Sequence, residues 1–420
     1  MAKNQKKEIF VFADWKELDE PILMGTLHVI PSKGEEIFSF EYAKTWLDSG
    51  HAQIIDPDLQ LYSGHQYVTG EKHNFGVFLD SSPDRWGKVL MKRREAALAK
   101  EEDRPVRPLF ESDYLLGVYD GHRMGALRFK DEMDGPFLDN NEKNPAPQWA
   151  SLRELEHASL ELEKEDIIGN PEYIKWLNML ISPGASLGGA RPKASIVDND
   201  GILWIAKFPS RGDIKNMGAW EAVANNLAVQ SGINMSDFQL KKFTKYNTYL
   251  TKRFDRTSNG KRIHFASAMT LLDYSDGADH TSGVSYIQLA EFIAQNGANV
   301  NEDLFQLWKR IVFSICISNT DDHLRNHGFL LTDKGWILSP AYDVNPMEDG
   351  RGLVLNITED DNALDTELAK KVIKYFRISS NQAEQTIQEI KTVVSTWRGV
   401  AKKYGLSQAE QEFMASAFKV

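Results

Sequence analysis

The chain has 420 residues, 42% hydrophobic and 26% charged, a composition typical of soluble globular proteins with two or three domains. Its net charge of −11 argues against broad, non-specific affinity for nucleic acid, although a local basic face remains open. Cys316 is the only cysteine, which excludes an intrachain disulfide and favours a reducing compartment. The apolar runs are too short for a membrane helix or a signal peptide. We therefore expect a cytoplasmic protein.

Short strands and turns are expected along the first 130 residues. The predicted strands cover 8–13, 24–30 and 35–42, with another ending at residue 130. One helix is expected among them, over 81–103, with a serine cap and Pro83 in its first turn. Its basic run at 88–95 is interpreted as the solvated side of that helix. The polar, turn-rich stretch 130–147 has no periodicity and predicts a linker.

Helices and strands alternate after this linker. Ser151 and Glu154 form the pattern of a capping box, which predicts a helix with Leu152, Leu155 and Leu162 on one face. Strands are predicted at 193–198, 202–208 and 248–254, and a helix closed by Gly232 at 219–232. From Phe265 onward helices dominate, and the last two are predicted at 381–404 and 407–418, the second opened by a capping box of Ser407 and Glu410.

The stretch "SNTDDHLRNHGFLLTDKGWILSPAYDV" (318–344) interrupts these helices. A long apolar helix delivers Asp321 to a loop, Asn326 follows five residues later, and a predicted hairpin ends near Asp343. In protein kinases such an Asp accepts the proton of the attacking hydroxyl, and the Asn and second Asp bind Mg²⁺. The spacing also arises by chance, and loop Asp and Asn residues commonly form turns. A zinc site at His323 or His327 would need closer ligand spacing.

Upstream segments supply the other parts of a phosphoryl-transfer site in the expected order. The glycine-rich stretch 182–197 would let backbone N–H groups approach a phosphate, although it is not a P-loop. Lys207 lies in a predicted strand, like the kinase lysine that contacts the phosphates, and its alternative is an edge-strand lysine that reaches solvent. Glu221 on the next helix stands where a kinase has the glutamate that pairs with that lysine. The order of these roles favours a kinase.

Five motifs resemble those of the HipA serine/threonine kinases, the toxins of bacterial type II toxin–antitoxin systems. They are "SLGGARPK" (186–193), "IAKFP" (205–209), "LTKRFDR" (250–256), "NTDDHLRN" (319–326) and "AYDVNP" (341–346). The segment "GVFLDSSPDRWGKVLMKRREA" is also similar to the N-terminal region of that family. The resemblance implies an α+β fold with a β-rich N-terminal module (1–145), followed by a two-lobed protein-kinase-like domain. Its nucleotide-binding N-lobe would cover 146–256 and its mostly helical C-lobe 257–420.

The resemblance also implies roles for individual residues. Asp321 would be the catalytic proton acceptor, Asn326 and Asp343 would bind Mg²⁺, and Glu221 would pair with Lys207. The implied ATP-binding residues are Gly188, Gly189, Ala190, Arg191, Lys193, Lys207, Lys252, Arg253, Phe254, His323, Asn326, Tyr342 and Asp343. Ser186 would be an autophosphorylation site whose phosphate ejects the loop and inactivates the kinase. The alternatives are a turn serine at this position, or Ser182 as the modified residue.

By this resemblance the chain would use ATP and Mg²⁺ to phosphorylate a translation component such as an aminoacyl-tRNA synthetase. Its partner would be a dimeric helix-turn-helix antitoxin of the HipB type, with which it would bind operator DNA and co-repress transcription. Two other hypotheses are a kinase of the same fold acting on a small molecule and a non-catalytic co-repressor. Two departures are Lys252, where many members have an acidic residue, and "HFASAM" (264–269), where a more polar pattern is expected.

Overall fold

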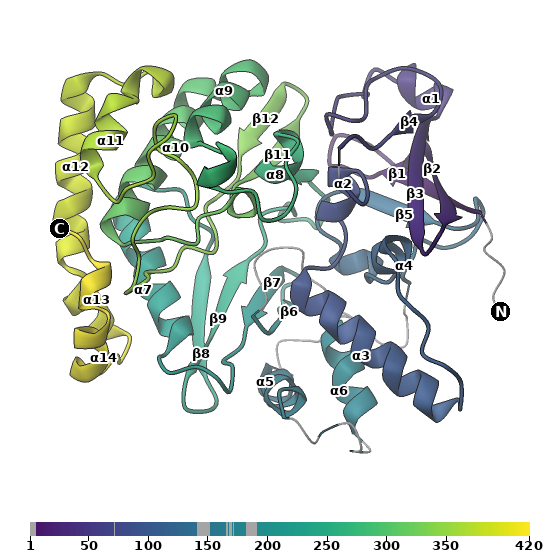
Figure 1. The fold of residues 1–420 in the computed structure, drawn as a ribbon, viewed down its shortest axis with the longest axis horizontal. Helices are drawn as coiled ribbons and strands as arrows, with labels where there is room; N and C mark the ends of the chain where they lie inside the picture. Colours follow the sequence, from purple (N-terminus) through teal and green to yellow (C-terminus); the bar gives the residue numbers. More distant parts are fainter. Residues whose placement is uncertain are drawn as a thin grey trace. The chain divides into compact units, whose positions relative to one another are not determined.

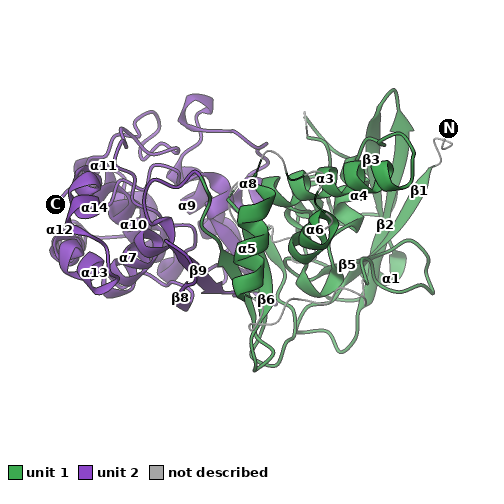
Figure 2. Cartoon of the chain, turned by 90° about the horizontal axis from the view of Figure 1, so that it is seen from below, with its two compact units in different colours: residues 1–211, 255–266 green, residues 212–254, 267–420 purple. Residues whose placement is uncertain are grey.

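The computed structural model describes two compact units of the chain (Figure 2). The first contains residues up to Arg211 together with Asp255–Ala266, and the second contains Gly212–Phe254 and Ser267–Val420. The described residues are 6–70, 72–140, 152–164, 167, 170, 172–181 and 191–420. The three-domain division expected from the sequence stays a prediction.

The first unit begins with strands and continues with helices (Figure 1). Its elements are β1 (Lys7–Ala13), β2 (Ile22–Ser32), β3 (Glu35–Tyr42), α1 (Lys44–Leu47), β4 (Gln66–Tyr67), α2 (Gly76–Asp80), α3 (Arg85–Glu101), α4 (Glu111–Leu116), β5 (Leu127–Lys130), α5 (Leu152–Leu162), α6 (Tyr173–Ile181), β6 (Lys193–Val197) and β7 (Leu203–Lys207).

The second unit is mainly helical. Its elements are α7 (Met217–Gln230), β8 (Phe238–Lys242), β9 (Asn247–Lys252), α8 (Ala268–Leu271), α9 (Tyr286–Asn296), α10 (Val300–Cys316), β11 (Gly328–Thr332), β12 (Gly335–Leu338), α11 (Thr366–Lys371), α12 (Ser380–Ser395), α13 (Trp397–Lys403) and α14 (Gln408–Phe413). The short strand β10 (Phe265–Ser267) spans the boundary between the two ranges.

A five-stranded antiparallel sheet organises the N-terminal part of the first unit, in the order β4-β3-β2-β1-β5. Alternate side chains of each strand point to one face, so Leu27 on β2 and Phe40 on β3 are fully buried. The ring of Phe78 on α2 packs against Phe40 and Phe129, with ring centroids 5.7 Å and 5.9 Å away. The predicted strands over 8–13, 24–30 and 35–42 are confirmed as β1, β2 and β3.

The helices of this region differ from the prediction in two ways. The cap of α3 is Asp84 rather than a serine, because its carboxylate accepts a hydrogen bond of 2.9 Å from the backbone N–H of Gly87. Pro83 therefore precedes the cap and lies outside the helix. The expectation of one helix among the strands was also wrong, because the structure contains α1, α2 and α4 in addition to α3. These three helices have only four to six residues, too few to show a helical periodicity in the sequence. On α5 the three predicted leucines are buried, while Ser151 lies outside the described residues.

Helix α10 is the centre of the second unit. Every residue from Leu307 to Cys316 is buried, and α9, α11 and α12 pack around it. The predicted helix over 381–404 is in fact two helices, α12 and α13, separated at Thr396. Ser407 caps α14 as predicted, but the Glu410 carboxylate accepts a hydrogen bond from Asn216 N at 2.6 Å, at the start of α7. Among the described helices, none combines the length and apolar character needed to cross a membrane.

Candidate active site

Two of the predicted phosphate-binding lysines lie side by side in the first unit. Strands β6 and β7 pair antiparallel with Lys193 directly opposite Lys207, and both side chains are buried. A buried ammonium group needs a charged partner. For Lys193 that partner is Asp84, whose Oδ2 lies 2.5 Å from Nζ, and both side chains are only 2% exposed. The sequence interpretation missed Asp84, although the motif "SSPDRWGK" that contains it was part of the family resemblance.

Part of the predicted phosphate loop lies outside the described residues. These positions are Ser182, Gly184, Ser186, Gly188, Gly189 and Ala190. Arg191, which follows them, is described, and Lys193 is the first residue of β6. Their contact with a nucleotide phosphate stays a prediction.

The second unit brings together Phe254 and Tyr342, two of the residues expected to contact ATP. The rings of Phe254 and Tyr342 pack with centroids 5.5 Å apart, and the Tyr342 hydroxyl donates a hydrogen bond of 2.6 Å to the carbonyl of Arg325. Lys252, at the end of β9, lies with its Nζ 3.7 Å from a carboxylate oxygen of Asp237. Arg253 is buried. Two aromatic rings held beside a backbone segment are a suitable surface for a planar base.

Glu221 is buried on α7 in the second unit, whereas Lys207 belongs to the first. The proposed ion pair of these two residues therefore stays a prediction. Burial raises the pKa of Tyr249 well above its usual value, and the negative charge of Glu221 raises it further. Glu221 is itself buried, and a carboxylate in such an environment interacts strongly with any nearby charge.

Hydrogen bonds tie the two acidic loops of the second unit to each other. After α10 the chain turns at Ser318, which has a left-handed φ of 51°. The Oδ1 atom of Asn319 accepts a hydrogen bond of 3.1 Å from the backbone N–H of Asn345, and Met347 N donates to Ser318 O at 3.2 Å. These bonds join the loop of Asp321 to the loop of Asp343. The sequence interpretation assigned no role to Asn319 or Asn345.

Asn326 has the environment of a metal ligand. Its side chain is buried, and its Nδ2 donates a hydrogen bond of 2.9 Å to the carbonyl of Asp321. Its Oδ1 is buried too and has no hydrogen-bond partner among the described groups. Asp343 has a left-handed φ of 56°, and its Oδ1 accepts a hydrogen bond of 3.2 Å from Asn345 Nδ2. A carboxylate and an unpartnered amide oxygen are the hard oxygen ligands that Mg²⁺ prefers, so these residues fit that ion.

Asp321 is the exposed member of this group. The pKa of its carboxyl is raised, chiefly because the surrounding chain removes part of its hydration, and the negative charges of Asp343 and Asp322 raise it further. His323 opposes these effects. A raised pKa makes a carboxylate a stronger base, which suits a group that accepts a proton from a hydroxyl. Asp343 thus contributes to the negative electrostatic environment of Asp321.

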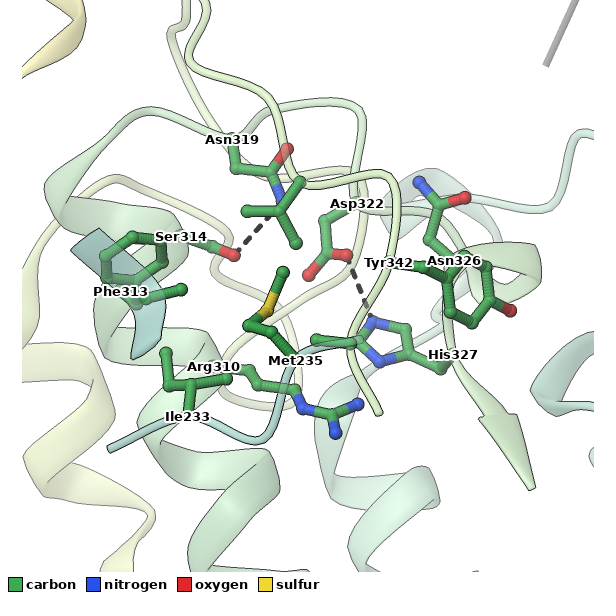
Figure 3. A pocket seen from close by; sticks show the side chains of 13 residues that line it. Ile233, Met235, Arg310, Phe313, Ser314, Asn319, Asp322, Asn326, His327 and Tyr342 are labelled. Atoms are coloured by element: carbon green, nitrogen blue, oxygen red, sulfur yellow. Dashed lines mark hydrogen bonds and ion pairs between the residues drawn. The ribbon is translucent and has the colours of Figure 1, made fainter. Parts of the chain in front are cut away.

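Asp322 has a different role from its neighbour. It is buried and accepts a hydrogen bond of 2.6 Å from the Tyr286 hydroxyl, and its Oδ1 lies 3.3 Å from His327 Nε2. Burial alone would raise the pKa of Asp322, but His327 and Tyr286 outweigh that effect and lower it. Asp322 and His327 both line a small pocket, and their side chains point toward each other (Figure 3). Asp322 therefore orients the loop from inside, and only the doubled aspartate in "TDDH" pointed to it in the sequence.

Comparison with known proteins identifies the family of the chain. The model of the HipA-like C-terminal domain family matches residues 185–397. A putative kinase of Haemophilus influenzae is 28% identical over 179 residues, 38% of this chain and 52% of that protein. The serine/threonine-protein kinase toxin HipA of Shewanella oneidensis is 24% identical over 189 residues, 39% of this chain and 43% of that protein. The alignments thus span about half the length of these relatives.

The fold extends the likeness to most of the chain. A crystallised complex of Shewanella oneidensis HipA with HipB and operator DNA contains a chain that superposes with a TM-score of 0.64 at 16% identity, covering 94% of this chain and 93% of that one. This likeness confirms the predicted α+β fold class, with its β-rich N-terminal module and mostly helical C-terminal part. Because the family model covers more than half of the residues, the chain belongs to the HipA-like family.

Proposed function

We propose that the chain is an ATP- and Mg²⁺-dependent serine/threonine protein kinase that acts in the cytoplasm as the toxin of a HipBA-like system. Its relatives named as kinases support the reaction class. The observation that carries the proposal is the state of Asn326. Its amide nitrogen holds the Asp321 loop while its buried Oδ1 has no partner among the described groups, as expected of a ligand waiting for a cation.

In the proposed reaction Asp321 orients a substrate hydroxyl and accepts its proton as the oxygen attacks the γ-phosphorus of ATP. Asn326 and Asp343 would hold Mg²⁺, whose positive charge would offset negative charge on the transferring phosphoryl group. Lys207 and Lys193 contact the phosphates, and Glu221 positions Lys207. Phe254 and Tyr342 pack beside the adenine, with the backbone of 252–254 as the hinge. The catalytic domain would then have two lobes, at 146–256 and 257–420.

The regulatory part of the proposal rests on the family. Autophosphorylation of Ser186 would add a charge of nearly −2 next to the nucleotide phosphates, and repulsion would expel the loop. The Shewanella oneidensis neighbour was crystallised with HipB and operator DNA. By analogy, a dimeric helix-turn-helix antitoxin would bind this chain and carry it to an operator, where both would repress transcription. The substrate would be a translation component such as an aminoacyl-tRNA synthetase.

Mg²⁺-dependent ATP turnover by the purified chain tests the catalytic core of this proposal. The wild type is compared with Asp321→Asn and with Asp333→Asn, an exposed aspartate of the β11–β12 turn that serves as the matched control. We expect turnover in the wild type and the control, and its loss in Asp321→Asn. Equal turnover in all three would contradict the role of Asp321. Absence of both nucleotide binding and turnover in the wild type would favour a non-catalytic co-repressor.

The acceptor of the phosphoryl group separates the two kinase hypotheses. We expect label from γ-labelled ATP to appear on serine or threonine of the chain itself or of an added protein. Label found only on small molecules from a cell extract would favour the small-molecule kinase.

A further inference from the structure

A second cluster of ligand-type side chains lies in the first unit, on the N-terminal sheet. His28 is on β2, Glu41 is on β3, and His65 immediately precedes β4. One potential ligand atom from each of the three lies within 4.8 Å of the others. None of these residues belongs to the proposed kinase site.

Strand register explains why residues distant in sequence meet here. In the antiparallel pairing Thr26 is opposite Glu41 and His28 is opposite Ser39, so His28 and Glu41 are diagonal neighbours on one face of the sheet. The β3–β4 pairing continues the same register toward His65. These strands form one end of the sheet in Figure 1. The opposite face carries the apolar core, so this face is the one available to a ligand.

His28 is the feature that an ordinary polar sheet face does not explain. Its residue exposure is only 8%, and neither ring nitrogen makes a hydrogen bond with any described group. A buried polar ring without a hydrogen bond costs free energy unless something else satisfies it.

Both histidines have a neighbour that would orient them as ligands. Oε1 of Glu8, on β1 directly opposite His28, lies 3.5 Å from Nδ1 of His28 without forming a hydrogen bond, so a small shift would let Nδ1 donate to Glu8 while Nε2 binds the ion. Nδ1 of His65 lies 3.3 Å from the Ser39 hydroxyl, and its Nε2 lies 3.8 Å from a carboxylate oxygen of Glu41. Metal-bound histidines usually interact through the other ring nitrogen with a carboxylate, a carbonyl or water, which fixes their orientation.

We propose that His28, Glu41 and His65 bind one Zn²⁺ ion, with water in the fourth coordination position. Two imidazole nitrogens and one carboxylate are a ligand set of zinc sites, whereas Mg²⁺ and Ca²⁺ prefer oxygen alone. Bonds of about 2.0–2.2 Å require ligand atoms roughly 3.3–3.5 Å apart, so the widest separation in the cluster must contract by up to about 1.5 Å. Glu41 and His65, each with a 45% exposed side chain, are free enough to make that adjustment.

The ion would clamp the edge of the sheet. Strand β4 has only two residues, and a bond from His65 to an ion held by β2 and β3 would anchor it. Metal binding to the folded chain stabilises that fold, and the stabilisation grows with the logarithm of the free metal concentration once this exceeds the dissociation constant. The N-terminal module would thereby gain a zinc-dependent stability unrelated to nucleotide binding.

The test is a titration of the full, metal-stripped chain with Zn²⁺. The buffer contains excess Mg²⁺, so that sites with oxygen ligands alone are already filled. The variants are His65→Ala and Glu41→Gln, both at exposed side chains, with His51→Ala as the matched control at an exposed histidine outside the cluster. We expect one tight zinc equivalent in the wild type and in His51→Ala. Replacing a group that merely supports a metal ligand typically lowers metal affinity about 10–100-fold. Because His65→Ala and Glu41→Gln each alter a proposed ligand itself, we expect both to lower zinc affinity by at least that factor.

Co²⁺ supplies an independent readout. In the wild type it should give the intense visible absorption of a four-coordinate site, and that absorption should be lost in His65→Ala although circular dichroism shows an unchanged fold. Equal zinc affinity in the wild type, His65→Ala and Glu41→Gln would overturn the proposal. So would a wild type that retains no zinc equivalent after dialysis against metal-free buffer.

Discussion

The buried ion pair of Asp84 and Lys193 gives the sharpest stability prediction. The two residues join the start of α3 to the start of β6, and each side chain is 2% exposed. Asp84→Asn removes the charge but keeps a good helix cap, because Asn caps helices about as well as Asp. Lys193→Met removes the opposite charge at similar volume. Each single change leaves one buried charge without its partner in this pair.

The expected cost follows from that burial. Breaking a buried pair by removing one partner destabilises a protein by about 3–5 kcal/mol, whereas replacing both partners with uncharged groups of similar size is often close to neutral. We therefore expect each single variant to lose about 3 kcal/mol or more. The double variant should be more stable than the sum of the two losses predicts, with a coupling energy of at least about 2 kcal/mol. Lys175→Met, at an exposed pair on α6, should change stability by under about 1 kcal/mol.

Hydrogen exchange measured on peptides from α3 and β6 is the suitable assay, because it reports the local free energy of opening in a chain with several units. Both segments should exchange faster in each single variant and recover most of their protection in the double variant. Strictly additive losses, or single losses as small as that of Lys175→Met, would refute the reasoning that this pair is buried and coupled.

Three further predictions concern other sites. Burial raises the pKa of Asp56 to about 6, so between pH about 4 and about 6 the folded state holds a proton that the unfolded state releases. The free energy of unfolding should therefore fall by up to about 1.4 kcal/mol per pH unit over that range as the pH rises. Urea unfolding should find this pH dependence lost in Asp56→Asn; its persistence in that variant, or its equal loss in the exposed control Asp48→Asn, would contradict the raised pKa of Asp56. Asn326→Ala should lower kcat about 100- to 1,000-fold. A magnesium titration should also show a higher Mg²⁺ concentration at half-maximal turnover, and an unchanged value would exclude Asn326 as a metal ligand. Tyr286→Phe removes the hydrogen bond to buried Asp322 and should cost about 1.5–3 kcal/mol in thermal unfolding, whereas an unchanged Tm would mean that water replaces the hydroxyl.

Local patterns account for the parts of the fold that were predicted correctly. Alternating apolar residues identify β1, β2 and β3, and an apolar helix of 17 residues identifies α10. The five-residue spacing of Asp321 and Asn326 identified a loop in which the structure joins them by a hydrogen bond. These features depend on residues close in sequence, so the sequence is sufficient to find them.

The features that were missed depend on contacts between distant residues. Asp84 and Lys193 are 109 residues apart, and no local pattern relates them. The cluster of His28, Glu41 and His65 appears only when strand register is known, because a shift by one residue would turn each side chain to the other face. The two carboxylates of the "DD" pair have identical side chains, and only burial distinguishes the exposed Asp321 from Asp322.

The central claim is that Asp321 enables transfer of the ATP γ-phosphoryl group to a hydroxyl, and intact mass with phosphopeptide mapping tests it most directly. The wild type and Asp321→Asn are first treated with phosphatase and then incubated with ATP and Mg²⁺. The account predicts one added phosphate in the wild type, on a serine of the stretch 182–197, and none in Asp321→Asn. Phosphate gained equally by both proteins, or by neither while ATP remains intact, would contradict it.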